Sequence, residues 1–280
     1  MEFEIGPEDF QELESETARE SAATSSFQYV RTARDGACFR IELARPPLHY
    51  IDLTMLEELH QIIGNLVFDE QVKVITLTAS GEYFSAGLDP RCMQSDDLFV
   101  VVDRFHRLVT QIIRMQPLVV GLINGHAYGA GCLIAAICDY TFAPSTARFG
   151  HPEMKYGHFA PLALLLYPRF MPKNRALYLA MTGEVVDAKT AAAWGLISWA
   201  LPPDQWKVQA DRFVQRLLTM STQALQYARQ TFWHTLIPDW DDRVREVEEF
   251  YLVQYASTED AREGIRAWLE QRAPKWRHVE

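Results

Sequence analysis

The 280-residue sequence lacks several features that would place it in a specialised class of protein. It has four cysteines, Cys38, Cys92, Cys132 and Cys138, and no C-x-x-C pair, so neither a disulfide framework nor a zinc site is indicated. Basic residues are fewer than acidic ones, 27 against 37, which argues against nucleic acid or an anionic membrane as the main partner. No apolar run approaches the roughly 20 residues of a membrane-spanning helix. The acidic N-terminus is the reverse of a signal or transit peptide, so we expect a reduced, cytoplasmic protein.

The composition that is present, 48% hydrophobic and 12% aromatic, is typical of a globular protein with a substantial core. Residues 1–26 are acidic and are interpreted as a mobile arm. From residue 27 the pattern predicts a hairpin about Asp35-Gly36, buried strands at "VKVITLTA" and "LVVGLI", and a helix over 97–115. "TMLEELHQIIGNLVFD" predicts another helix, with Thr54 and Glu57 as its capping box. Helices over 204–234 and 239–271 complete an α/β core (27–200) with a helical C-terminal region (201–280).

Two loops that contain glycine each follow a buried strand directly, "GEYFSAGLD" (81–89) and "NGHAYGAG" (124–131). Neither loop carries the Lys-Ser/Thr of a phosphate-binding loop or reads G-x-G-x-x-G, so a nucleotide phosphate is poorly supported. What the loops offer is backbone N–H groups, and two strand ends side by side can aim two of these at one oxygen, as an oxyanion hole does. Glycine turns required only for packing remain the alternative.

Longer segments resemble the crotonase (enoyl-CoA hydratase/isomerase) superfamily in order and spacing: "FSAGLD", "VVGLINGHAYGAGCLIAAICDYTFAPSTARFGHPEMKYG" and "ALYLAMTGEVVDAKTAAAWGLISWALP". The resemblance covers residues 27–280. "ELARPPLHYIDLTMLEEL" and "YGHFAPLALLLYPRF" are most similar to the branch that hydrates cyclic dienoyl-CoA esters. The resemblance implies an α/β fold, the crotonase spiral of ββα turns, with C-terminal helices that cover the site and join subunits into a homotrimer or hexamer. Aromatic residues suited to an interface follow residue 200: Trp233, Trp240, Phe250, Tyr251 and Trp268.

The resemblance also implies an acyl-CoA substrate whose thioester oxygen is held by the N–H groups of Leu88 and Ala130. The adenine and pantetheine are expected to lie against the loop of residues 85–89. The residues expected to contact the substrate are Ser85, Ala86, Gly87, Asp89, Gly129 and Leu133. No cofactor is implied beyond the coenzyme A of the substrate, and no metal. An acyl carrier protein in place of coenzyme A remains open, because the pantetheine arm is the same.

The catalytic residues that the resemblance implies are incomplete in this chain. Hydratases of the superfamily hold one water between two glutamates, of which the second matches Glu153 in "HPEMK". The first would fall three residues after Ala130, where this chain has Leu133. Losing a positioned acid–base group typically costs about 10²–10⁴-fold in rate. A single carboxylate still suffices to remove a proton from one carbon of a thioester dienolate and return it to another.

Three further side chains are auxiliary candidates. His158 lies five residues beyond Glu153 and either orients the substrate, replaces the missing acid, or serves as a structural histidine. His126 and Tyr128 lie within the second loop, where a side chain faces either the acyl pocket or the core. Tyr83 and His151 flank the motifs and are interpreted either as packing residues or as residues that support those in contact with the substrate.

We therefore expect an enzyme of enoyl thioesters, with a double-bond isomerase that uses Glu153 favoured over a hydratase that has replaced its second acid. A non-catalytic acyl-CoA binding protein is the alternative of a different class, which Leu133 permits. Glu153 argues against it, because a carboxylate beside an apolar pocket is costly unless it is used or paired.

Overall fold

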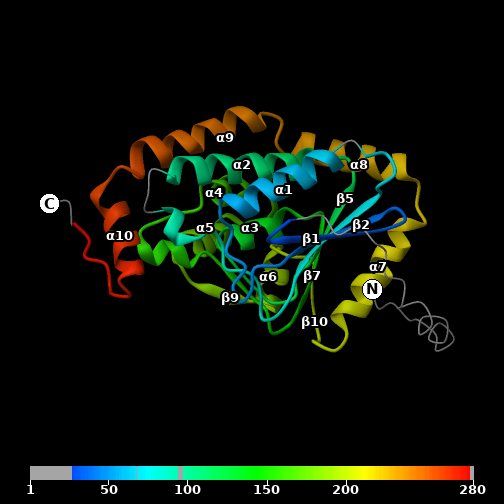
Figure 1. The fold of residues 1–280 in the computed structure, drawn as a ribbon, viewed down its shortest axis with the longest axis horizontal. Coiled ribbons are helices and arrows are strands. Elements are labelled where there is room, and N and C mark those ends of the chain that lie inside the picture. Colours follow the sequence, from blue (N-terminus) through cyan, green and yellow to red (C-terminus); the bar gives the residue numbers. More distant parts are fainter. Residues whose placement is uncertain (1–26, 68, 94–96, 278–280) are drawn as a thin grey trace.

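The computed structural model describes residues 27–67, 69–93 and 97–277, and the expected arm at residues 1–26 lies outside them. The described residues form a mixed α/β fold in which helices pack around two sheets (Figure 1). The larger sheet runs β1 (Val30–Asp35), β2 (Cys38–Leu43), β3 (Val74–Ala79), β5 (Leu118–Leu122), β7 (Tyr140–Pro144), β10 (Trp199–Leu201). The smaller sheet runs β4 (Tyr83–Ser85), β6 (His126–Tyr128), β8 (Arg148–Gly150), β9 (Val185–Asp187).

The strands confirm what the local pattern predicts. β1 and β2 pair antiparallel as a hairpin, and Gly36 in its turn has φ +53°, a conformation that glycine adopts without strain. β3 and β5 pair in parallel from Val74↔Leu118 onward, and both are almost entirely buried. A strand that is buried on both faces of a parallel sheet is expected to be a continuous apolar run, as these two segments are.

The sheet topology brings the two glycine loops together. β3 and β5 are parallel neighbours, so the chain leaves both at the same edge of the larger sheet. β4 and β6, which follow them, pair in parallel in the smaller sheet. The residues after β4 and after β6 therefore lie side by side, which is the placement that the sequence predicted for the loops.

Helices cover the sheets on both sides (Figure 1). α1 (Leu53–Leu66), α2 (Leu98–Arg114) and α9 (Trp240–Glu248) lie along one side, and α3 (Ala130–Ile137) follows β6. The remaining helices are α4 (Pro161–Phe170), α5 (Lys173–Met181), α6 (Ala188–Trp194), α7 (Trp206–Leu218), α8 (Thr222–Leu236) and α10 (Glu259–Leu269). α7 packs Trp206, Ala210 and Val214 against apolar residues of β3, β5 and β7, so the C-terminal region contributes to the core of the larger sheet.

The start of α1 differs from the expected capping box. The N-cap residue is Asp52, whose Oδ1 accepts a hydrogen bond from the N–H of Met55 at 2.9 Å. Thr54 is already inside the helix, and the box was therefore assigned two residues too late. Aspartate caps a helix as well as threonine does, so both positions met the local rule and only the backbone conformation separates them.

The two long helices expected after residue 200 are each divided. The first is split into α7 and α8 by a new N-cap at Ser221, whose Oγ accepts from the N–H of Ala224. The second is split into α9, a π-helical segment η4 (Glu249–Tyr255) and α10, which is capped by Thr258. The prediction of uninterrupted helices was wrong, because serine and threonine caps within polar segments look like ordinary surface residues.

A buried ion pair fixes α8 against the sheet. The guanidinium of Arg229 and the indole N–H of Trp233 both donate to the carboxylate of Asp139, which directly precedes β7. The other guanidinium nitrogens of Arg229 donate to carbonyl oxygens at the end of α2, including that of Ile112. One arginine therefore joins α2, α8 and the start of β7, close to the helices that enclose the site.

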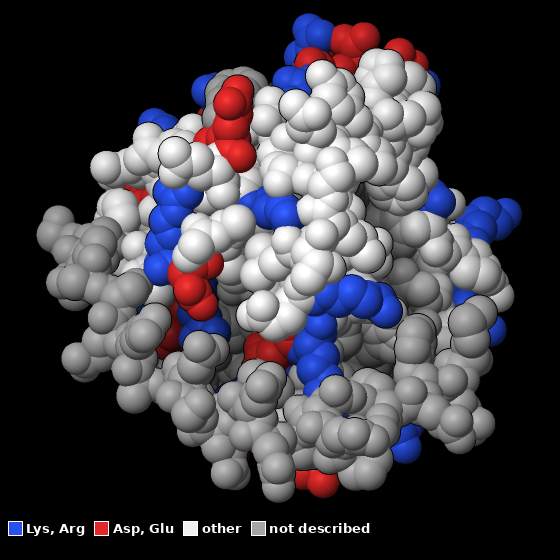
Figure 2. Space-filling model, turned by 90° about the vertical axis from the view of Figure 1, so that its right-hand side faces the viewer, with Lys and Arg blue, Asp and Glu red and all other residues white. Residues whose placement is uncertain are grey.

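Of the five aromatic residues expected at a subunit interface, Trp268 is partly buried and the other four are either buried or exposed. Trp233, Trp240 and Tyr251 are buried within the chain and are not available to a partner. Phe250 is exposed. Apolar side chains on the outside of the C-terminal helices include Val208, Tyr227, Phe232 and Val253. Figure 2 shows the side of the molecule where α7 and α8 lie, and uncharged side chains cover much of its upper part.

Candidate active site

The two glycine loops touch through their backbones. Gly87 has φ +99°, and a Cβ placed on it would lie 3.0 Å from the carbonyl oxygen of Tyr128 and 3.3 Å from the nitrogen of Ala130. A Cβ on Gly131 would lie 2.6 Å from the carbonyl oxygen of Ser85. No side chain fits between the loops at either point, and glycine at both positions allows the approach.

This approach places two unused donors together. Within the described residues, neither the N–H of Leu88 nor that of Ala130 has a hydrogen-bond partner. Ala130 is the first residue of α3, where the N–H groups have no intrahelical acceptor and carry the positive end of the helix dipole. The pair is suited to an oxygen that gains negative charge, as a thioester oxygen does when it becomes an enolate.

Ser85 and Asp89 hold the first loop and do not line the cavity. The hydroxyl of Ser85 donates to the carbonyl of His49 at 2.8 Å and accepts from the N–H of Gly87 at 3.1 Å. Burial raises the pKa of the Asp89 carboxyl, but hydrogen bonds and charge from Arg91 outweigh it and leave that pKa below its usual value. Both side chains are thus engaged within the protein, whereas the loop backbone between them faces the cavity.

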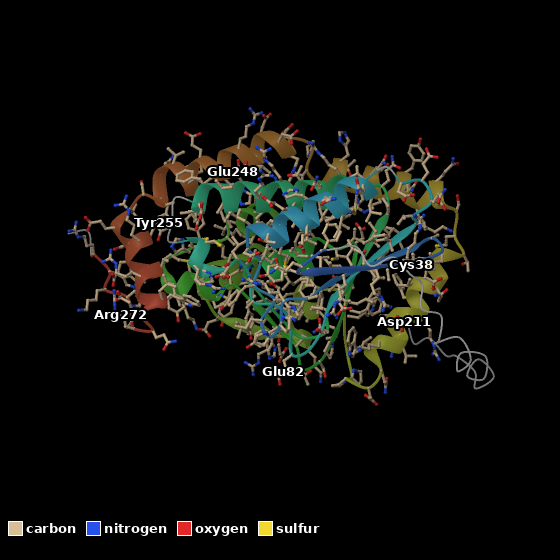
Figure 3. All side chains as sticks on the ribbon, in the orientation of Figure 1. Cys38, Glu82, Asp211, Glu248, Tyr255 and Arg272 are labelled. Carbon is tan, nitrogen blue, oxygen red and sulfur yellow. The ribbon has the colours of Figure 1, made fainter. Side chains whose placement is uncertain are left out.

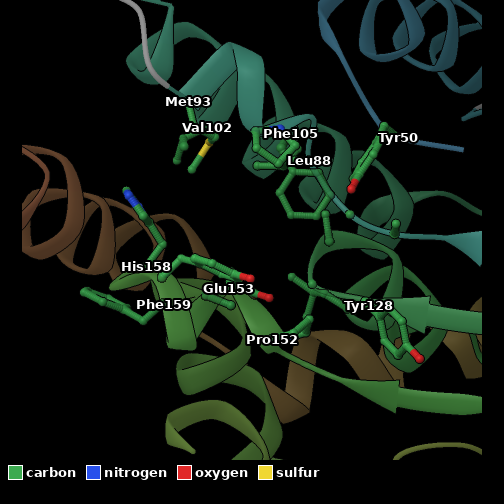
Figure 4. Close-up of a pocket in the computed structure, with 18 of the residues that line it drawn as sticks. Tyr50, Leu88, Met93, Val102, Phe105, Tyr128, Pro152, Glu153, His158 and Phe159 are labelled. Carbon is green, nitrogen blue, oxygen red and sulfur yellow. The ribbon is translucent and has the colours of Figure 1, made fainter. Parts of the chain in front are cut away.

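A cavity of about 300 Å³ opens beside these donors (Figure 4). Ala86, Gly87, Leu88, Gly129, Ala130 and Leu133 line it, as expected of residues that contact the substrate. The wall is rich in aromatic side chains, among them Tyr50, Tyr83, Phe105, Tyr128, Phe159 and Trp268. Such a lining suits a flat, apolar acyl group.

Glu153 is the one carboxylate among the described residues that line the cavity. It belongs to the short 3₁₀ helix η3 (Pro152–Tyr156), and its side chain retains 30% exposure toward the cavity. A Cβ on Gly129 would lie 3.1 Å from Oε2 of Glu153, so this oxygen lies against the second glycine loop. Oε1 accepts a hydrogen bond from Nδ1 of His151 at 2.8 Å. The carboxylate is therefore fixed by one oxygen and presents the other beside the paired N–H groups.

Behind Glu153, the side chain of His151 has no exposed surface. Its Nε2 lies 2.7 Å from the hydroxyl of Tyr167, which in turn donates to the sulfur of Cys132 at 3.5 Å. An ionised carboxylate only accepts hydrogen bonds, so Nδ1 of His151 donates to Glu153, and this paired negative charge favours the protonated ring. Burial alone lowers the pKa of His151, but the charges and hydrogen bonds of Glu153 and Cys132 together outweigh it and raise that pKa to about 10.

Leu133 occupies the position where the resemblance expects a second carboxylate. It lies in α3, one turn from the oxyanion donors, is 1% exposed and lines the cavity. Its neighbours in the helix, "AGCLIAAI", are all buried but one. No described side chain of this helix can accept or donate a proton to a substrate in the cavity.

His158 lines the cavity, but both of its ring nitrogens are occupied. Nε2 donates to the carbonyl oxygen of Ala261 at 2.9 Å, which leaves Nδ1 to accept from the hydroxyl of Tyr251 at 2.7 Å. Burial lowers the pKa of His158, consistent with a neutral ring. The residue ties the segment before α4 to α10 and η4. The structure therefore favours the structural interpretation over a substitute acid.

His126 and Tyr128 differ in their position relative to the cavity, because only Tyr128 lines it. His126 does not line the cavity, and its buried Nδ1 has no hydrogen-bond partner within the described residues. Its ring stacks on Tyr128 with centroids 5.8 Å apart and meets Tyr83 edge-on at 5.2 Å. Tyr83 and Tyr128 themselves line the cavity.

The sequence analysis missed His106, which also lines the cavity. It lies in α2 with Val102 and Phe105, three and four residues apart on the face that meets the cavity. Nδ1 of His106 is 2.8 Å from a carboxylate oxygen of Glu248 in α9. A histidine within the apolar stripe of the predicted 97–115 helix was the available signal, but its partner lies 142 residues away.

Within the part of the chain that the structure describes, no group of three or more His, Cys, Asp or Glu side chains is placed to hold a metal ion. No described helix has the length and apolar character needed to cross a membrane.

Comparison with known proteins agrees with this geometry. The chain is 28% identical to a cyclohexa-1,5-dienecarbonyl-CoA hydratase of Thauera aromatica over 243 residues, 87% of this chain and 94% of that one. It is 27% identical to a carnitinyl-CoA dehydratase of Escherichia coli, over 87% and 96% of the two chains. A crystal structure of an enoyl-CoA hydratase from Mycobacterium avium shares the fold, with a TM-score of 0.81 and 22% identity over 90% and 99% of the chains. The model of the enoyl-CoA hydratase/isomerase family matches residues 33–279, so the chain belongs to that family.

Proposed function

We propose that the protein shifts a double bond in an enoyl thioester, with Glu153 as the base that starts the reaction. The observation that carries the proposal is that Glu153 is the one carboxylate lining the described cavity, beside two free N–H groups, while Leu133 occupies the place of a second acid. Oε2 of Glu153 removes a proton from a carbon conjugated with the carbonyl. The electrons move to the thioester oxygen, where the N–H groups of Leu88 and Ala130 stabilise the dienolate. Protonation at another carbon restores the thioester, and no water is added.

The aromatic wall supports a substrate with a flat or cyclic unsaturated acyl group, carried on coenzyme A. One relative is named for a cyclic dienoyl-CoA ester, which agrees with this shape. The site requires no cofactor for a proton shift, because one C–H bond breaks, another forms and the double bond moves between them with no net oxidation or reduction. We further propose that the enzyme is cytoplasmic and assembles as a homotrimer or hexamer through its exposed C-terminal residues.

Hydration is a second candidate, since two relatives are named for adding or removing water at acyl-CoA esters. It would require a second group to hold the water, because Leu133 offers no polar atom. The two reactions give products of different mass, and this makes them easy to separate.

The test is to incubate the protein with linear, branched and cyclic enoyl-CoA esters in D₂O and to follow them by NMR and mass spectrometry. We expect an isomer that has gained deuterium but not the mass of water. Glu153→Gln should abolish the reaction while leaving ester binding nearly unchanged, and Glu184→Gln, at an exposed glutamate, is the matched control. A hydrated product with no isomer would exclude the isomerase. Binding of esters with neither reaction nor exchange would favour the non-catalytic alternative. Turnover confined to esters of an acyl carrier protein would show that this protein, and not coenzyme A, carries the acyl group of the substrate.

A further inference from the structure

α2 places a histidine in the wall of the cavity that faces Glu153. Figure 4 shows Val102 and Phe105 of α2 across the cavity from Glu153, and His106 lines the same cavity from the same helix. His106 is 3% exposed, which is unusual for an ionisable side chain.

The ring of His106 is oriented by a carboxylate outside the cavity. Its Nδ1 is 2.8 Å from Oε1 of Glu248, the last residue of α9, which lies over α2 (Figure 3). An ionised carboxylate only accepts hydrogen bonds, so Nδ1 carries the proton. Within the described residues, nothing hydrogen-bonds to Nε2. A buried imidazole held at Nδ1 by a carboxylate, with Nε2 free, is the arrangement that prepares histidine to transfer a proton.

The other candidate groups that line the cavity do not provide an oriented imidazole with a free ring nitrogen. The second histidine of the wall, His158, has both nitrogens engaged, and Leu133 has no polar atom. Of the described histidines that line the cavity, His106 is therefore the one with a ring nitrogen that is not hydrogen-bonded within the protein.

We infer that His106, oriented by Glu248, is the second proton-transferring residue of this site. The inference rests on the proposed function and extends it. Glu153 takes a proton from one carbon of the acyl chain, and His106, after taking up a solvent proton at Nε2, gives that proton to another carbon on the α2 side. After one turnover Glu153 is protonated and His106 is neutral, and solvent restores both. With Glu153 alone, the proton that leaves one carbon would be returned to the other by the same carboxyl group.

Deuterium separates the two schemes. In D₂O the wild-type protein should place solvent deuterium at the protonated carbon in the first turnover, with no transfer of the substrate's own hydrogen. His106→Gln should form isomer about 10²-fold more slowly, while exchange at the carbon that Glu153 deprotonates continues. Glu153→Gln should lose both exchange and isomerisation. Glu248→Gln should lower kcat about tenfold with little change in KM, because it acts on orientation alone.

Two further variants address folding and specificity. His106→Ala leaves space beside Glu248, and added imidazole should restore part of the isomerisation, which a merely structural role would not allow. His60→Gln is the matched control, since His60 bonds to Gln111 and to the carbonyl of Arg104 in α2 but does not line the cavity.

The outcomes distinguish the inference from the function beneath it. An active wild type whose His106→Gln variant isomerises at an unchanged rate overturns the inference and leaves the proposed function standing. Retention of the substrate's own hydrogen in the wild-type product does the same. A wild type that neither exchanges nor isomerises any ester overturns both.

Discussion

The buried pair of His151 and Glu153 predicts how the stability of the protein depends on pH. Folding raises the pKa of His151 from 6.5 to about 10, since the charges and hydrogen bonds of Glu153 and Cys132 together outweigh the cost of burial. The stabilisation from this pair is therefore complete below pH 6.5 and is lost as the pH rises through 10. Over that range the free energy of unfolding should fall by about 1.4 kcal/mol per pH unit from this group. The total, roughly 3–5 kcal/mol, is the size expected when one partner of a buried ion pair is lost.

The assay is urea unfolding at pH 6 to 9, followed by fluorescence of the seven tryptophans at one fixed protein concentration. His151→Gln keeps hydrogen-bonding capacity but removes the charge. We expect the difference in unfolding free energy between wild type and variant to be largest at pH 6 and to shrink by several kcal/mol toward pH 9. His234→Gln, at an exposed histidine of α8, should parallel the wild type. A difference in unfolding free energy between wild type and variant that stays constant with pH would show that His151 is neutral in the folded protein. It would contradict the raised pKa of His151.

Three further predictions concern the loops and the assembly. Ala130→Pro should fold, since proline suits the first position of a helix, but the lost N–H should lower kcat about 10²–10³-fold; an unchanged kcat would remove this donor from the mechanism. Gly129→Ala should lower kcat about 10²-fold, because its Cβ would lie 3.1 Å from Glu153 and displace the base; ester binding, measured by calorimetry, should change less. Light scattering at micromolar concentration should give the mass of a trimer or of a multiple of a trimer. Phe232→Glu should weaken this assembly, whereas a monomeric wild type would contradict it.

Much of the fold could be predicted because its signals are local. The hairpin at Asp35-Gly36 and the buried strands β3 and β5 are each specified by a few neighbouring residues. The approach of the two loops also follows, since neighbouring parallel strands end at one edge of a sheet. Where two local signals compete, the outcome was less certain, as at Asp52 and Thr54, and the Ser221 cap that begins α8 was not predicted.

The contacts that define the candidate site join residues that are not neighbours in the sequence. Tyr167 reaches His151 from α4, and Glu248 reaches His106 across 142 residues, so neither pair has a spacing that a sequence reveals. Ser85 shows the same limit, since its hydroxyl binds a carbonyl 36 residues earlier and so turns away from the cavity that its neighbours line. Motif matching supplied the residues of the loops, but only the packing of α2, α4 and α9 shows which side chains stand behind them.

The charges around the cavity relate the uncharged Leu133 to the two histidines, His151 and His106. Two carboxylates facing one small apolar cavity repel each other, and each loses hydration, so one of them tends to remain protonated. This chain places the positive charge of His151 directly against Glu153, and the cavity-lining histidine with a free ring nitrogen, His106, is paired with a carboxylate outside the cavity. Restoring a glutamate at position 133 would add an unpaired charge to a helix that is almost wholly buried. The absence of a second carboxylate is therefore consistent with the proposed division of proton transfer between Glu153 and His106.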